Sequence, residues 1–258
     1  MRNALTIAGK ELRAAFVSPI AYVVLTGFML LGGWFFFNLL ARFNFLLQIY
    51  SSFRNNPEAL QRLNLNDFVL APLLHNLSVI LVILIPVITM RSFAEEKRAG
   101  TYELLMTSPL SIGEIVAGKF LGTVAFLIVM LGLTAIYPVI LLIYGNPELG
   151  VMASGYLGLF LIAVSFATVG LLTSSLTDNQ IVAAVSCLVI LLLLYVIAWP
   201  AETAGPALGA VLKYLSLTEH FSELVKGVID TQHLVYFASV IVLALYLTHR
   251  SVESVRWR

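Results

Sequence analysis

Residues 181–200 read IVAAVSCLVILLLLYVIAWP and contain no charged side chain. A helix of about twenty such residues is long enough to cross the hydrocarbon core of a lipid bilayer, which is roughly 30 Å thick. Five similar runs cover about residues 20–41, 69–90, 120–144, 156–176 and 233–249. The apolar residues are continuous rather than alternating, and an open sheet leaves backbone groups unpaired in lipid. We therefore expect six transmembrane helices.

The composition of the chain agrees with this prediction. Hydrophobic residues make up 60% of the 258 residues and charged residues only 11%, compared with roughly 25% charged residues in soluble domains. The mean hydropathy is +0.95. The predicted fold class is all-α, a polytopic membrane protein in which residues 1–258 form a single transmembrane domain. The first apolar run is too long for the core of a signal peptide, so we interpret it as the first span.

The positive charges of the loops predict the orientation, since cytoplasmic loops carry an excess of Lys and Arg. One side receives ten of the 15 Lys and Arg residues, and the other side receives five. The ten are Arg2, Lys10, Arg13, Arg91, Lys97, Arg98, Lys119, Arg250, Arg256 and Arg258. We therefore expect both termini, and the loop after the second span, to lie in the cytoplasm.

The first 18 residues have the pattern of an amphipathic helix. Apolar side chains share one arc of a helical wheel, and the cations Arg2, Lys10 and Arg13 lie on a neighbouring arc. Such a helix lies in the membrane interface, with its apolar face in the lipid and its cations near anionic head groups. Ile7 and Glu11 do not fit this pattern. The alternative is an ordinary positively charged segment before the first span.

The loop at residues 91–119, RSFAEEKRAGTYELLMTSPLSIGEIVAGK, holds eight charged residues. Capping boxes of the type S-x-x-E begin at Ser92 and Ser111 and predict two helix starts. Gly100 is expected to end the first helix, and an apolar tip follows at residues 104–106. We therefore predict a compact helical segment that docks into a soluble partner through apolar anchors and a charged rim. The alternative is a solvated loop whose charges only keep it out of the membrane.

The segment at residues 201–232 lies on the outer side in this topology. Residues 205–215 form an apolar run that is too short to span and suits a re-entrant or interfacial helix. A capping box at Ser216 predicts a second short helix, with Gly227 as its stop. The candidate functional residues of this outer hairpin are His220, Phe221, Gly227 and Asp230. The hairpin either gates the outer mouth or serves as a lid without a gating role.

The sequence lacks the features of several function classes. The cores of the predicted spans contain no Asp, Glu, Lys or Arg, which argues against an ion-coupled carrier. There is no P-loop sequence and no motif of a membrane-embedded enzyme. The four histidines are scattered without the spacing of metal ligands. We therefore expect no catalytic residue, no metal site and no bound cofactor, and the net charge of +1 does not indicate a nucleic-acid partner.

Three motifs in a fixed order resemble one family. FAEEKRAGTYELLMTSPLS, followed by IxxGK, lies between the second and third spans. SSLTDNQIVAA (174–184) lies between the fourth and fifth spans, and YLSLTEHFSELVKGVID (214–230) precedes the sixth. Together with six spans and an N-terminal interfacial helix, this set is similar to type-2 ABC transporter permeases, and in particular to their gliding-motility-associated branch.

The resemblance implies partners and a location. In this family two permease subunits, alike or related, pair in the bacterial cytoplasmic (inner) membrane. Each rests on a cytoplasmic ATPase subunit, which binds the ATP, and an auxiliary membrane protein facing the periplasm is a further candidate partner. The loop at 91–119 then corresponds to the coupling helix, which fits a groove of the ATPase, and the N-terminal helix is a second contact. The implied coupling residues are Glu95, Glu96, Lys97, Arg98, Thr101, Glu103, Leu104 and Leu105.

The expected function is that of the permease subunit of an ATP-driven exporter. Two alternatives stay open at this point. One is a membrane anchor that transmits force within an ATPase-driven assembly or motility complex, and the other is an ATP-independent carrier. The sequence does not indicate the substrate, because charge-free, mildly polar spans suit lipid-linked, peptide and hydrophobic cargo equally.

Overall fold

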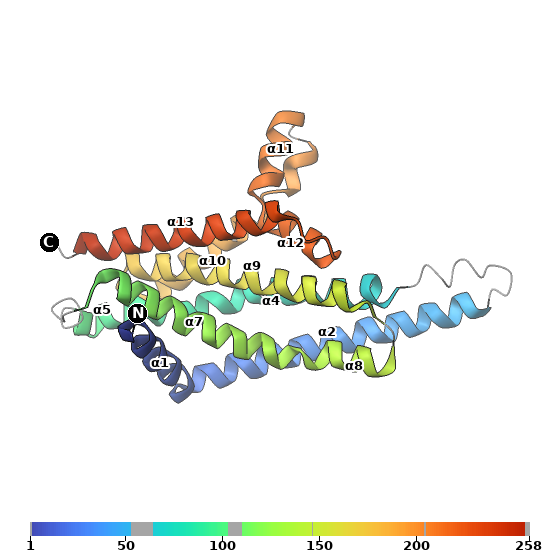
Figure 1. The fold of residues 1–258 in the computed structure, drawn as a ribbon, viewed down its shortest axis with the longest axis horizontal. Coiled ribbons are helices and arrows are strands. Elements are labelled where there is room, and N and C mark those ends of the chain that lie inside the picture. Colours follow the sequence, from blue (N-terminus) through green and yellow to red (C-terminus); the bar gives the residue numbers. More distant parts are fainter. Residues whose placement is uncertain (1, 53–63, 103–109, 146, 204, 256–258) are drawn as a thin grey trace.

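The computed structural model describes residues 2–52, 64–102, 110–145, 147–203 and 205–255. The regular elements within these ranges are all helices (Figure 1). In chain order they are α1 (Arg2–Val17), α2 (Pro19–Ser52), the π-helical turn η1 (Asn66–Leu70), α4 (Ala71–Thr89), α5 (Arg91–Arg98), α7 (Ile112–Thr134), α8 (Ile136–Tyr144), α9 (Leu149–Leu176), α10 (Gln180–Val196), the 3₁₀ turn η2 (Trp199–Glu202), α11 (Pro206–Leu215), α12 (Leu217–Val225) and α13 (Thr231–Val255).

Six helical stretches are long and apolar enough to cross a membrane. They are Pro19–Ile49, Asn66–Arg98, Ile112–Tyr144, Leu149–Leu176, Gln180–Ala201 and Thr231–Ser254. The predicted all-α polytopic membrane protein with six spans is therefore confirmed. The second stretch is longer than its apolar run, because η1 precedes α4 and α5 continues it after a break at Met90.

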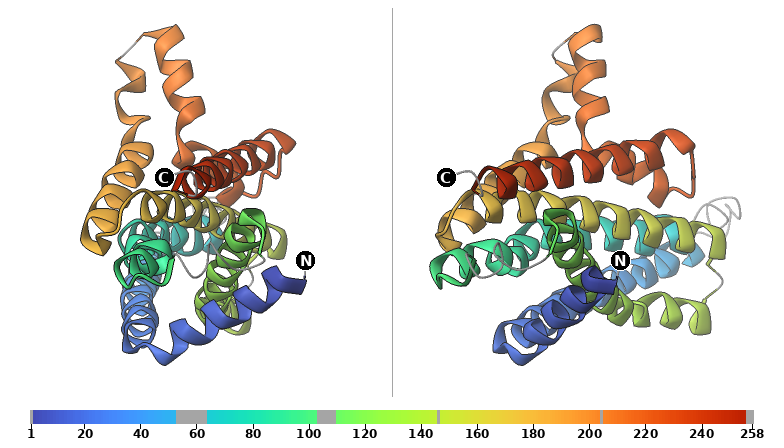
Figure 2. Two further views of the ribbon diagram at one scale, coloured as in Figure 1. Left: turned by 90° about the vertical axis from the view of Figure 1, so that its left-hand side faces the viewer. Right: turned by 60° about the vertical axis from the view of Figure 1, so that its left-hand side comes forward.

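Helix α9 lies at the centre of the bundle and contacts α4, α5, α7, α10, α12 and α13 (Figures 1 and 2). Glycines along α9 let two of these neighbours approach closely. A Cβ added to Gly155 would lie 2.5 Å from Leu74 Cδ1 of α4, and one added to Gly158 would lie 2.9 Å from Leu224 Cβ of α12. At Gly158 the added atom would meet the base of the Leu224 side chain, so the crossing of α9 with α12 depends on glycine. At Gly155 it would meet the terminal methyl group of Leu74, which would have to shift.

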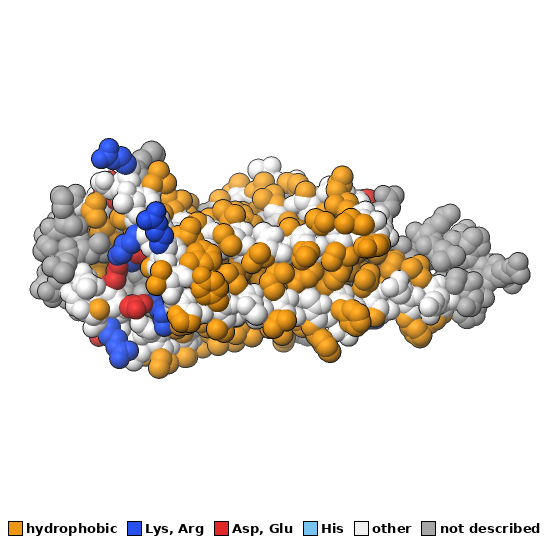
Figure 3. Space-filling view, turned by 90° about the horizontal axis from the view of Figure 1, so that it is seen from below, with side chains coloured by type: hydrophobic (Ala, Val, Ile, Leu, Met, Phe, Trp, Pro, Cys, Tyr) orange, Lys and Arg blue, Asp and Glu red, His pale blue; other side chains and the backbone are white. Residues whose placement is uncertain are grey.

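The molecule has an apolar middle and a charged end (Figure 3). On the face shown, hydrophobic side chains cover the long middle, and charged side chains gather at the end where α1 and α5 lie. α13 finishes at the same end, as an even number of spans requires (Figure 1). That this end faces the cytoplasm stays a prediction from the loop charges.

The two short helices predicted for the outer segment are present. η2 and α11 project sideways from the bundle, whereas α12 packs against α9 and α13 (Figures 1 and 2). Ser216 Oγ accepts a hydrogen bond from Glu219 N at 3.4 Å and caps the start of α12. Gly227, with φ of 92°, follows α12 in the left-handed region that favours glycine, so the predicted stop is confirmed. Entry of α11 into the bilayer stays a prediction.

Candidate functional site at the charged end of the bundle

Helix α1 lies directly against α7, and two glycines of α7 set the distance between them. A Cβ on Gly118 would lie 2.6 Å from Ile7 Cβ, and one on Gly122 would lie 2.8 Å from Glu11 Cβ. The predicted N-terminal helix is thus present, and part of its surface packs against protein. This contact explains why Ile7 and Glu11 depart from the amphipathic pattern, because both side chains face α7.

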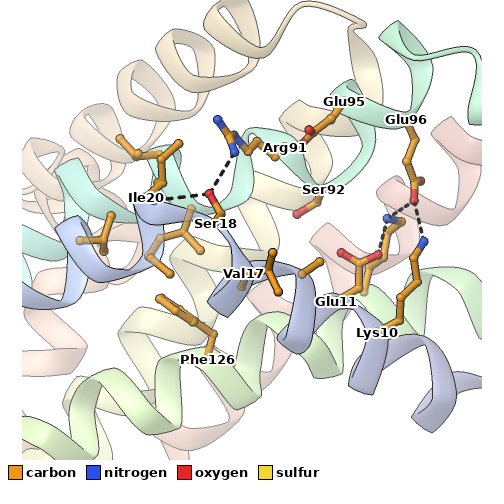
Figure 4. A pocket seen from close by; sticks show the side chains of 17 residues that line it. Lys10, Glu11, Val17, Ser18, Ile20, Arg91, Ser92, Glu95, Glu96 and Phe126 are labelled. Carbon is orange, nitrogen blue, oxygen red and sulfur yellow. Dashed lines mark hydrogen bonds and ion pairs between the residues drawn. The ribbon is translucent and has the colours of Figure 1, made fainter.

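A buried lysine joins three helices at this crossing. Lys119 of α7 is 2% exposed, and its Nζ lies 3.0 Å from Glu11 Oε1 of α1 and 2.9 Å from Glu96 Oε1 of α5. Lys10 Nζ of α1 lies 3.8 Å from the same Glu96 oxygen (Figure 4). Lys119 Nζ also lies 5.2 Å from the centre of the Phe93 ring, within the range of a cation–π contact. We call Lys10, Glu11, Glu96 and Lys119 the Lys119 junction.

The charges of the Lys119 junction depend on one another. A buried ammonium is costly unless it is paired and hydrogen-bonded, and here two carboxylates from different helices surround it.

The sequence indicated Lys119 only as one more loop cation, because its partners are far away along the chain. Two signals were present: a glutamate on the wrong face of an amphipathic helix, and a lysine directly after Gly118.

Helix α5 is fastened to the end of α9 by hydrogen bonds between the Ser174 hydroxyl and backbone groups at the start of α5. Ser174 Oγ accepts from Phe93 N at 3.0 Å and from Ala94 N at 3.2 Å, and it donates to Met90 O at 3.0 Å. The capping box predicted at Ser92 is therefore wrong: the residue before α5 is Met90, which has helical backbone angles and no side-chain cap. The physical reason is that Ser174 of α9 supplies the acceptor that Ser92 was expected to provide.

The capping box predicted at Ser111 is confirmed. Ser111 Oγ accepts from Glu114 N at 3.2 Å, and Ser111 N donates to Glu114 Oε2 at 3.2 Å. Asn3 Nδ2 of α1 donates to Glu114 Oε1 at 3.1 Å, so the first turn of α7 is a further contact for α1. Gly100 has φ of 70° and lies after α5, as expected for the residue that ends that helix.

Lys97 is half-buried and points from α5 toward the end of α9. Its Nζ donates to Ser175 O at the end of α9 and lies 5.3 Å from the centre of the Tyr102 ring. Ser251 Oγ of α13 donates to the same Ser175 carbonyl at 3.2 Å. Burial raises the pKa of the Tyr102 hydroxyl to about 12, and the nearby Glu96 adds to this shift. The motifs at 93–119 and 174–184, distant in sequence, therefore meet at one place.

The predicted coupling residues fall into three groups. Glu95, Arg98 and Thr101 are exposed, whereas Glu96 and Lys97 are turned into the protein. Glu103, Leu104 and Leu105 lie outside the described residues. The cations predicted for the interfacial helix, Arg2, Lys10 and Arg13, are exposed on α1. The structure thus leaves Glu95, Arg98 and Thr101 as the described members of the set that are accessible to a partner.

At the opposite end, two histidines of the outer segment meet. His220 Nδ1 lies 2.7 Å from His233 Nδ1, and His220 Nε2 donates to Tyr214 O at 2.9 Å. The interpretation that all four histidines are scattered is therefore wrong for this pair, because α12 folds back on α13. The described residues contain no group of three or more metal-ligating side chains. A carbonyl only accepts, so neutral His220 is protonated at Nε2 and accepts the Nδ1 proton of His233.

The other three candidate residues of the outer hairpin make contacts within the protein. Phe221 is fully buried and its ring centre lies 5.2 Å from that of His75. Asp230 Oδ1 accepts from Gln232 N at 3.3 Å at the start of α13. A Cβ on Gly227 would lie 3.0 Å from Val151 Cγ2. The contacts of Phe221 and Gly227 hold α12 and the turn after it against α4 and α9, and a gating role stays a prediction.

Acidification is expected to loosen the contact between α12 and α13. Burial lowers the pKa of His220, and the charge of His233 lowers it further. The hydrogen bond to Tyr214 O and the charge of Glu219 raise the pKa by less, so the net shift is downward. The folded-state pKa therefore lies below the ordinary value of 6.5. Neutral His220 stabilises the fold above about pH 6.5, and this contribution is lost as the pH falls through the folded-state pKa of His220.

Hydrogen exchange measures this effect. Amides of α12, corrected for intrinsic exchange, should be less protected at about pH 5 than at about pH 7.5. The variant His220→Gln cannot be protonated and should show no such difference. Equal protection of the unmodified protein at both pH values would contradict the prediction.

The family model described as ABC-2 family transporter protein matches residues 5–250. The match includes most of α1, the Lys119 junction, the outer hairpin, the first five candidate spans and most of the sixth. A search of curated proteins gave no match. The chain therefore belongs to the ABC-2 transporter family and is a membrane-spanning permease subunit of an ABC transporter.

Proposed function

We propose that this permease receives the movement of a separate ATP-binding subunit at α5 and passes it to its spans through the Lys119 junction. The observation that carries the proposal is the buried Lys119, which ties α5 and α1 to α7 through two carboxylates. Ser174 ties the same α5 to α9. A displacement of α5 therefore moves a helix that lies at the centre of the bundle.

The exposed face of α5 suits docking. Glu95 and Arg98 carry opposite charges on a short helix whose other side is held by Phe93 and Ala94, both fully buried. A partner that pushes on α5 moves the helices attached to it, because the backbone and the inward side chains of α5 are anchored to them. Exposed charges of both signs set the register and the rate of association with a complementary surface.

The remaining assignments are proposals that rest on the family resemblance. We place two ATP-binding subunits, which hold the ATP, below a pair of permeases in the bacterial cytoplasmic membrane with both termini in the cytoplasm. The chain itself then has no catalytic role and holds no cofactor. Export is the proposed direction, and membership of the gliding-motility-associated branch rests on the three motifs. A force-transmitting membrane anchor would use the same junction.

Reversing the exposed charges of α5 should release the ATP-binding subunit. In the double variant Glu95→Lys, Arg98→Glu, each rim charge would meet a like charge of the partner, which costs several kcal/mol at an interface. Co-purification from native membranes in mild detergent should recover less of the ATP-binding subunit, by about tenfold or more. ATP turnover of the purified complex measures the same loss.

The double variant Glu148→Lys, Lys213→Glu is the matched control, because it reverses exposed charges of the same kinds away from the charged end. It should co-purify with the ATP-binding subunit as the unmodified permease does. The Lys119 junction is untouched in both variants, so the spans should unfold as before. If α5 reversal leaves assembly and turnover unchanged, α5 is not the coupling element.

A further inference from the structure

A cavity of about 380 Å³ opens at the charged end between α1, α2, α4, α5 and α7 (Figure 4). Ligand pockets occupy roughly 300–1,000 Å³, so this volume is sufficient for part of a small molecule. Exposed residues mark its mouth, namely Lys10, Ala14, Val17 and Glu95. Buried side chains form its floor, namely Ala21, Val24, Lys119 and Phe126.

The wall of the cavity is divided by polarity along the bundle axis. Toward the middle of the bundle it is apolar, with Val24 of α2, Ile88 of α4 and Phe126 of α7. Toward the charged end it carries hydroxyl and charged groups, including Ser18 and Arg91 (Figure 4). Since the apolar middle lies in the hydrocarbon and the charged end at the membrane surface, the cavity leads from the head-group level into the acyl region.

Arg91 lies where the two parts of the wall meet. Its Nη1 donates to Ser18 Oγ at 3.4 Å, and its buried Nε has no hydrogen-bond partner. No described carboxylate forms an ion pair with Arg91. Of the lining carboxylates, Glu11 and Glu96 pair with Lys119, and Glu95 is exposed at the mouth. An unpaired buried donor costs about 1–3 kcal/mol, and a guanidinium binds phosphate oxygens through several N–H groups.

We propose that this cavity binds one glycerophospholipid with an amine-bearing head group, taken from the leaflet at the charged end. The phosphate lies on the Arg91 guanidinium and the Ser18 hydroxyl. The ammonium group of the lipid lies near Glu95, the exposed carboxylate at the mouth. One acyl chain extends along the apolar wall between α2, α4 and α7.

The lining favours this lipid over a free anion. A free phosphate would leave the apolar wall in contact with water and would bring no cation for the carboxylate of Glu95. An amine-bearing lipid covers the wall and pairs with both charges. The cavity shares Glu95 with the exposed face of α5 that is proposed to meet the ATP-binding subunit, so lipid binding is tested on the permease alone.

Native mass spectrometry of the full-length, delipidated permease provides the test, with phosphatidylethanolamine as the added lipid. One lipid should stay bound at low concentration. Arg91→Gln should weaken this binding by about tenfold, the effect of losing a hydrogen bond to a charged group. Ala14→Phe, which fills the mouth, should weaken it as well, and Arg91→Lys, which keeps the charge, should lose less than Arg91→Gln.

Arg98→Gln is the matched control, since Arg98 is an exposed arginine of α5 that does not line the cavity, and lipid binding should be unchanged. Phosphatidylglycerol, which lacks the amine, should bind more weakly than phosphatidylethanolamine. Equal binding by the unmodified protein and the Arg91→Gln variant would overturn the proposal. Displacement of the lipid by inorganic phosphate, with no effect of Ala14→Phe, would show an anion site and overturn it too.

Discussion

Replacing Lys119 with methionine should separate α1 from α5 and destabilise the permease. The substitution removes the cation that two carboxylates share, at 3.0 and 2.9 Å, and leaves Glu11 and Glu96 partly buried without it. Breaking a buried ion pair by removing one partner costs about 3–5 kcal/mol, and we expect the lower end because both carboxylates keep some access to water. The free energy of unfolding in mixed detergent micelles measures the loss.

Two further variants show whether the loss comes from the junction. Lys226→Met is the matched control, because Lys226 pairs with Glu223 at 2.7 Å but its side chain is 63% exposed. An exposed pair of this kind contributes at most about 1 kcal/mol. In the triple variant Glu11→Gln, Glu96→Gln, Lys119→Met, no buried charge is left unpaired, and Lys10, which loses Glu96, has a side chain that is 68% exposed. Most of the stability should therefore return. If Lys119→Met and Lys226→Met have equal effects, the junction does not stabilise the fold.

Replacing Gly118 with alanine should displace α1 from α7. The new Cβ would lie 2.6 Å from Ile7 Cβ and 3.0 Å from Ala4 O, and both groups belong to the body of α1, so the whole helix must move. Overpacking of this kind costs about 1–3 kcal/mol. Limited proteolysis at Arg13 should become faster, because α1 would lose its support, and ATP turnover of the complex should fall with it.

Gly132→Ala on the same helix is the control for this prediction. A Cβ at Gly132 has nothing within 4 Å, so the change should add helix propensity and stabilise α7 by up to about 1 kcal/mol. Gly118→Ala is thus expected to lower the stability and Gly132→Ala to raise it. A gain in stability at both positions would show that α1 is not held by close approach to Gly118.

Local sequence signals predicted the elements that depend on neighbouring residues. Ser111 and Glu114 cap the start of α7 as expected, since both lie within one turn of the same helix. Gly100 and Gly227 end helices where positive φ is required. The predicted cap at Ser92 is wrong because the amides of Phe93 and Ala94 donate instead to Ser174, which lies on another helix.

The candidate site was only partly visible in the sequence. The loop charges indicated the charged end, and the motifs indicated α5, but neither indicated which side chains face inward. Glu96 and Glu95 are adjacent and chemically alike, and yet Glu96 joins Lys119 while Glu95 stays exposed. His220 and His233 are 13 residues apart in the sequence, and the turn after α12 places their Nδ1 atoms 2.7 Å apart.

The sequence by itself determined that this protein is a bundle of six membrane-spanning helices, because twenty apolar residues in a row have one stable arrangement in lipid. It also determined the charged end, since charges are excluded from the hydrocarbon. Only the tertiary structure decided that Lys119 is buried between Glu11 and Glu96, and that Ser174 anchors α5. Such pairings join residues far apart in sequence, and they follow from which helices cross and how closely glycine lets them approach.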